Sequence, residues 1–240
     1  MNIHTKKEFR YGLKRGLPIA IGYLPVSFAF GLNAVSGGIP APLVILMSLT
    51  NLTSAGQAAG ADLIIQGAGY FELVLTIFVI NIRYMLMSLS ISQKVEKNVT
   101  LPQRLIFAFG ITDEVFAVSS MEEGRLSFSY MLGLISGPIL GWTFGTALGA
   151  FICSALPASI KDAMGIALYG MFIAIIIPPA RKSRKVVLVL VISILVTCIL
   201  KYLPILSNIS SGFRVIIATF LSAGYCAIRF PLDQETGGGV

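Results

Sequence analysis

Charged side chains stand inside two otherwise apolar stretches of the sequence. Arg83 lies near the middle of the apolar run 71–92, and the adjacent carboxylates Asp113 and Glu114 lie in the run 105–120. An arginine at mid-bilayer depth is costly unless it is paired or hydrated. Two neighbouring carboxylates repel each other when both are ionised, so one of them is expected to hold a proton or a cation. We therefore predict an ion pair between Arg83 and Asp113, with Glu114 left to exchange a proton or bind an ammonium group; the two carboxylates could also have the opposite roles.

Each of these charges has a structural alternative. The ion pair of Arg83 could serve only to stabilise the fold, although the forked guanidinium is equally suited to a substrate carboxylate or to gating. Asp113 and Glu114 could lie at the membrane face, because more charged residues follow at positions 122–125. The sequence leaves both explanations open.

Uncharged hydrogen-bonding groups are densest between Thr50 and Gly60, where the sequence is TNLTSAGQAAG. A break followed by a short helix would present free N–H groups and the positive end of a helix dipole to a carboxylate. The small residues could instead serve only to let two membrane helices pack closely. Together with the Asn-Ile-Arg-Tyr motif of the run 71–92, the candidate substrate-binding residues are Asn51, Ser54, Gly56, Gln57, Asn81 and Arg83.

The composition indicates a protein of the lipid bilayer. Of the 240 residues, 55% are hydrophobic and only 12% are charged, whereas a soluble domain carries about 25% charged residues. Five cations precede the first apolar run and four more lie between Arg181 and Lys185. Basic residues at the ends of spans follow the positive-inside rule, so the net charge of +7 does not indicate nucleic acid.

Several features argue against an enzyme or a metal site. The only histidine, His4, precedes the apolar runs, and the cysteines Cys153, Cys198 and Cys226 are scattered without metal-ligand spacing. The sequence contains neither a P-loop nor a Gly-x-Ser-x-Gly motif. We therefore predict no catalytic residues, no metal and no cofactor.

Apolar runs at eight places are candidate spans: 16–35, 41–69, 71–92, 105–120, 128–156, 164–180, 186–204 and 212–229. If all eight cross, the loop with Lys94, Lys97 and Arg104 falls outside the cell, against the charge rule. If 41–69 and 105–120 each enter and return on one side, six crossings remain and that loop becomes cytoplasmic. The expected fold is thus an all-α transmembrane bundle of 6–8 spans, and the choice between broken and re-entrant segments stays open.

The expected organisation has three parts. Residues 1–15 form a basic cytoplasmic N-terminal tail, residues 16–229 the transmembrane domain, and residues 230–240 a cytoplasmic C-terminal tail. The polar residues favour a small-solute transporter, and the alternative is a non-transporting scaffold or sensor subunit.

At these motifs the sequence resembles the azaleucine-resistance (AzlC-type) family, the large subunit of branched-chain amino acid exporters. The most specific likeness is Thr-Asp-Glu-x-Phe-Ala, which follows the Asn-x-Arg motif. The similar stretches cover roughly the first half of the chain: Gly16 to Ala34, Met47 to Gly60, Asn81 to Ser88 and Gly110 to Ala117.

The resemblance implies export of valine, leucine, isoleucine or analogues such as azaleucine across the bacterial plasma membrane. The adjacent carboxylates Asp113 and Glu114 add the expectation that this secondary transport is proton-coupled. The resemblance also implies a small AzlD-type membrane protein as partner subunit. In the family a histidine often follows the arginine, whereas Tyr84 stands there in this sequence. The family roles therefore carry over to Asn81, Arg83, Asp113 and Glu114, but not to position 84.

Overall fold

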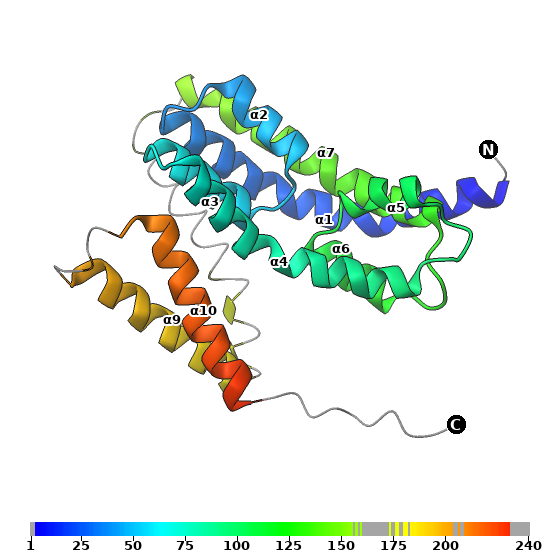
Figure 1. Ribbon diagram of the computed structural model, residues 1–240. Helices are drawn as coiled ribbons and strands as arrows, with labels where there is room; N and C mark the ends of the chain where they lie inside the picture. The colour runs from blue at the N-terminus through cyan, green and yellow to red at the C-terminus, as the bar shows by residue number, and fades with distance from the viewer. Residues whose placement is uncertain are drawn as a thin grey trace. The chain divides into compact units, whose positions relative to one another are not determined.

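The computed structural model describes residues 3–155, 183–203 and 209–230, with a few isolated positions between them. These residues form helices joined by short loops, which confirms the predicted all-α fold (Figure 1). The chain divides into two compact units, which we describe separately. Unit 1 contains Met1–Gly67 and Ile77–Met171, and unit 2 contains Ala68–Thr76 and Phe172–Val240.

Within the described residues, five helices are long and apolar enough to cross a membrane. Each coincides with a predicted span, because the apolar runs exceed the roughly 20 residues that a crossing requires. The five helices are α1 (Ile3–Ser36), α4 (Tyr70–Lys94), α7 (Phe128–Ile152), α9 (Arg184–Tyr202) and α10 (Ser211–Arg229). The predicted span 164–180 lies outside the described residues, and so does the predicted C-terminal tail apart from Phe230.

Helix α1 begins earlier than the predicted span. The segment 3–15, expected as a tail, is helical and continuous with the apolar stretch that follows. Gly12 in this segment and Gly16 directly after it both pack against backbone atoms of α7, and the helix continues through them.

The predicted break in the run 41–69 divides it into α2 (Ala41–Thr50) and α3 (Ala55–Ile65). A Cβ added to Gly37, near the end of α1, would collide with the Ile65 side chain. The end of α3 therefore lies beside the end of α1, close to where α2 begins. The segment enters unit 1 and returns at the same end, as a re-entrant hairpin.

The second predicted break divides the run 105–120 between α5 (Leu101–Ala108) and α6 (Asp113–Met121). The Lys94 ammonium, at the end of α4, donates to the carbonyls of Ser120, at 2.8 Å, and Glu122. Since α5 begins only seven residues after Lys94, this segment also returns where it entered. The structure thus supports the re-entrant alternative for both segments.

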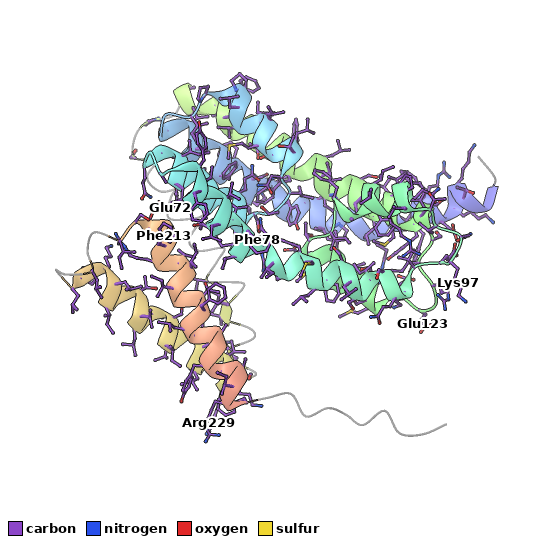
Figure 2. The ribbon with its side chains drawn as sticks, viewed as in Figure 1. Glu72, Phe78, Lys97, Glu123, Phe213 and Arg229 are labelled. Atoms are coloured by element: carbon purple, nitrogen blue, oxygen red, sulfur yellow. The ribbon has the colours of Figure 1, made fainter. Side chains whose placement is uncertain are left out.

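The two hairpins enter unit 1 from opposite ends. The N–H of Leu126, just before α7, donates to the Lys94 carbonyl at 2.9 Å, and Ser127 Oγ donates to Glu8 Oε2 at 2.9 Å. The start of α1, the end of α4 and the start of α7 therefore share one end with α5 and α6, while α2 and α3 occupy the other (Figure 1). Figure 2 labels Lys97 and Glu123 in two loops at the α5–α6 end.

Helices α1 and α7 form the main contact of unit 1, and their backbones touch. A Cβ added at any of seven glycines would lie less than 3.0 Å from a backbone atom of the other helix. These glycines are Gly12, Gly16, Gly31, Gly133, Gly141, Gly145 and Gly149. Small residues at four-residue spacing allow membrane helices to approach this closely.

In unit 2, α9 and α10 pack against each other. The first turns of α4 also belong to this unit, where the buried Glu72 carboxylate accepts the Gly212 N–H at 2.9 Å. Figure 2 shows Glu72 beside Phe213. A carboxylate at a helix N-terminus is favoured by the helix dipole, so Glu72 anchors the start of α10.

The contact between α1 and α7 predicts that Gly149→Ala destabilises the protein by about 1–3 kcal/mol, the usual cost of overpacking. Its new methyl group would overlap the Phe28 carbonyl of α1. Gly22→Ala is the matched control, because no atom lies within 4 Å of its added Cβ. Thermal unfolding in detergent should show a lower melting temperature for Gly149→Ala and no loss for Gly22→Ala. Equal melting temperatures would contradict the close packing of α1 and α7.

Candidate functional site

The two re-entrant hairpins place helix N-termini in the interior of unit 1. Helix α3 starts after the non-helical residues 51–54 and runs back to the end from which α2 entered. Helix α6 starts after the non-helical residues 109–112 and runs back to the opposite end of unit 1, from which α5 entered. Each N-terminus carries a partial positive charge of about +0.5 and N–H groups without helical partners. Both ends therefore favour negative charge in the interior of the bundle.

The predicted ion pair between Arg83 and Asp113 is present. Arg83 Nη1 lies 2.8 Å from Asp113 Oδ2, so it joins the middle of α4 to the first residue of α6. The two side chains are 39% and 34% exposed, so the pair is not sealed in the core. Arg83 also donates to the Tyr84 hydroxyl at 3.2 Å and lies over its ring at 4.9 Å.

Glu114 has a different partner. Its carboxylate accepts a hydrogen bond from the Tyr23 hydroxyl, which also lies 2.8 Å from Thr112 Oγ1. Thr112 is the N-cap of α6 and accepts the Val115 N–H at 3.3 Å. Tyr23 thus ties the middle of α1 to the start of α6, and the two adjacent carboxylates face different partners.

A buried polar network holds the other hairpin. Trp142 Nε1 of α7 donates to Gln57 Oε1 at 2.8 Å, and Gln57 Nε2 donates to Ser48 Oγ at 2.6 Å. The Ser48 and Thr146 hydroxyl oxygens lie 2.7 Å apart. All four side chains are buried. The edge-on contact between Trp142 and Tyr23, with centroids 5.3 Å apart, connects this network to the start of α6.

Asn81 lies against the first turn of α3. A Cβ added to Gly56 would lie 2.5 Å from Asn81 Oδ1, so only glycine lets the amide come this close. Asn81 Oδ1 and Arg83 Nε are buried and have no hydrogen-bond partner among the described residues. Such unsatisfied groups are unfavourable in an apolar interior. One acceptor and one donor, two residues apart on α4, are thus without a partner among the described residues.

The structure brings most of the predicted site residues together at these helix ends: Gly56, Gln57, Asn81, Arg83, Asp113 and Glu114. Gln57 already uses both polar atoms of its amide within the protein. Their roles toward a substrate stay predictions.

Asn51 and Ser54 lie in the break itself. Asn51 Oδ1 accepts from Thr53 Oγ1 at 2.7 Å. Ser54 has a φ of 33°, which is unusual for a residue with a side chain. Backbone strain of this kind is often kept at functional sites. It marks the point where the chain turns back into α3.

The sequence alone did not identify the side chains that support the site, above all Tyr23 and Trp142. Two signals in the sequence point to Trp142. Trp142 is the only tryptophan, and it lies in a stretch with a glycine at every fourth position from Gly133 to Gly149. That spacing indicates a helix face in close contact with a neighbour, beside which a large side chain must find its own space.

A family model and several relatives place the chain among known membrane proteins. A family model described as "AzlC protein" matches residues 18–156, more than half of the chain. The sequence is 30% identical over 185 residues to "Inner membrane protein YgaZ" of Escherichia coli (strain K12), covering 74% of this chain and 75% of that protein. It is 35% identical over 185 residues to an "Uncharacterized membrane protein" of Archaeoglobus fulgidus, covering 74% and 78%.

A more distant relative carries a function in its name. The "Branched-chain amino acid transport protein AzlC" of Bacillus subtilis (strain 168) is 22% identical over 198 residues, which cover 77% of this chain and 75% of that protein. No solved structure matches the chain.

The buried network predicts a stability coupling between Trp142 and Gln57. Trp142→Phe removes the indole N–H and leaves Gln57 Oε1 buried without its donor, which costs about 1–3 kcal/mol. Adding Gln57→Met removes the stranded acceptor, so the double variant should be more stable than the sum of the two single losses. Thermal unfolding of the four proteins measures this coupling, and strictly additive losses would contradict it.

Proposed function

The chain belongs to the AzlC protein family and is a membrane transporter, and from that premise we propose that it exports branched-chain amino acids across the bacterial plasma membrane. The substrates would be valine, leucine, isoleucine or analogues such as azaleucine. Support comes from the Bacillus subtilis relative, whose name assigns it branched-chain amino acid transport. The observation that carries the proposal is the Arg83–Asp113 ion pair at the interior N-terminus of α6. Asn81 of the same helix α4 lies against the first turn of α3.

This arrangement suits a zwitterion. A substrate carboxylate would bind Arg83, whose Nε has no partner among the described residues, and the N-terminal turn of α3. Its ammonium group would bind Asp113, together with Asn81 Oδ1, which likewise has no partner in the described part of the chain. Binding would replace one internal ion pair with two pairs to the substrate. Neither protein charge is then left alone in the low-dielectric interior, which lowers the cost of opening the pair.

Glu114 is the candidate for proton coupling. It is not paired with Arg83, and its hydrogen bond from Tyr23 connects it to α1 and, through Trp142, to the other hairpin. A proton on Glu114 would remove the charge that Tyr23 and the α6 N-terminus stabilise. Proton binding would thereby alter the contact between α1 and α6, which gives coupling a physical route.

Charge distribution supports the proposed orientation. Lys6, Lys7 and Arg10 at the start of α1 lie at the same end of unit 1 as Lys94 and Arg104. By the positive-inside rule, this end and the N-terminus are cytoplasmic. The hairpin of α5 and α6 would then enter from the cytoplasm and that of α2 and α3 from outside.

A partner subunit forms part of the proposal. We expect a small AzlD-type membrane protein to assemble with this chain, as the family resemblance implies. Helix α4 offers it an exposed apolar face at Phe78, Ile82 and Met85. Transport is therefore measured with and without that subunit.

Arg83→Ala should reduce leucine efflux from loaded cells or proteoliposomes by about tenfold or more, since losing a contact of 1.4 kcal/mol already changes an equilibrium tenfold. Arg83→Lys should recover only part of the flux, because a lysine cannot form the forked contact. Arg125→Ala is the matched control, because this exposed arginine lies in the loop before α7. Membrane insertion and melting temperature are checked for each variant.

Wild-type efflux by a well-inserted Arg83→Ala variant would contradict the assigned role. If the unaltered chain moves no amino acid in either the presence or the absence of the small subunit, it acts as a scaffold instead.

Substitutions of Asp113 and Glu114 should affect different steps of transport. Glu114→Gln can still accept from Tyr23 but cannot titrate, so exchange of internal for external leucine should persist while efflux driven by a pH gradient is lost. Asp113→Asn should mainly raise the KM for leucine. Both are read from the same proteoliposomes, with and without the gradient. Normal gradient-driven efflux by the well-folded Asp113→Asn/Glu114→Gln variant would remove both roles.

A further inference from the structure

The first turns of α1 present three cations on one face. Lys7, Arg10 and Lys14 follow the helical spacing i, i+3, i+7, and all three are exposed. Together with Tyr11 and Leu13 they line a shallow, open cavity of about 490 Å³ that is formed by exposed side chains of this one helix. Among the described residues, none of the three forms an ion pair, whereas the next cation, Arg15, lies 3.8 Å from Glu122. The cavity thus gathers positive charge that no described acidic residue pairs with.

The cavity lies where α1 changes from charged to apolar. The apolar stretch begins at Gly16, and the exposed side chains of Leu17 and Ile21 continue along the helix beyond the cations. In a membrane, this transition lies at the level of the lipid headgroups. Lysine and arginine side chains bind lipid phosphates there, and tyrosine is enriched there. A ligand for this cavity therefore has negative charge at one end and hydrocarbon at the other.

We propose that the cavity binds an anionic phospholipid of the leaflet that faces the start of α1. Lys7, Arg10 and Lys14 hold the phosphate and the acidic headgroup, and an acyl chain lies along Leu13 and Leu17. Charge complementarity favours this occupant over a zwitterionic lipid, whose own cation would meet the three basic side chains.

The cavity also connects to the transport site. The Tyr11 hydroxyl donates to Glu122 Oε1 at 3.0 Å, and its ring lies 5.7 Å from the ring of Tyr130. Glu122 directly follows α6, whose other end carries Asp113. A lipid seated against Tyr11 thus steadies the end of the helix that presents the candidate carboxylates.

Binding is measured by native mass spectrometry of the purified full chain with phosphatidylglycerol or phosphatidylcholine, and by the melting temperature with each lipid. Lys7→Gln/Arg10→Gln/Lys14→Gln should weaken phosphatidylglycerol binding by about tenfold or more and abolish the lipid-dependent rise in melting temperature. The matched control, Lys6→Gln/Lys97→Gln/Arg125→Gln, removes the same charge at the same end of unit 1 but outside the cavity, and should bind normally.

The single reversal Arg10→Glu, at an exposed position, serves if the triple variant folds poorly, and should weaken binding in the same direction. Equal loss in the triple variant and its control would mean general charge attraction and overturn the proposal. Equal binding of phosphatidylcholine by the unaltered chain would do so as well. A third arm adds inorganic phosphate alone: the same stabilisation by phosphate would show a site for a free anion instead of a lipid.

Discussion

Helices α1 and α7 touch backbone to backbone along a row of glycines, and the rest of unit 1 depends on that contact. In lipid, apolar side chains gain little by leaving one hydrocarbon environment for another, so close van der Waals packing must hold the helices together. The same two helices carry the side chains that reach the re-entrant hairpins. Tyr23 of α1 bonds to α6, and Trp142 of α7 bonds to α3. Separating α1 from α7 would therefore displace both hairpins.

The hairpins in turn explain how charges survive in the interior. Asp113 begins α6, where the helix dipole favours an anion, and it pairs with Arg83 at 2.8 Å. Glu114 shares the dipole and takes its hydrogen bond from Tyr23. Among the described residues, the arrangement neutralises most of its own charge but gives no partner to a buried donor and a buried acceptor on α4. In the proposed function, a small zwitterion would supply both partners.

Much of the fold and of the candidate site could be predicted from the sequence. Charged residues and glycines inside an apolar run are unfavourable unless the structure compensates for them. The spans, the two breaks and the Arg83–Asp113 pair followed from that cost. The choice between broken and re-entrant segments could not be predicted. It depends on the tertiary contacts of Ile65 and Lys94, which the sequence does not specify. Gln57 illustrates a second limit: an amide in a polar stretch suits a ligand, and only packing reveals its bonds to Trp142 and Ser48.

The central claim, that substrate binds where the interior ends of α3 and α6 meet α4, can be tested by protection of a single cysteine. Cys153, Cys198 and Cys226 are replaced by serine, and Ala55→Cys is introduced at the start of α3, with Thr100→Cys before α5 as the control. A site at these helix ends predicts that leucine slows alkylation of the cysteine at position 55 and not at position 100. Unchanged alkylation at position 55, under conditions in which the same variant transports leucine, would contradict it.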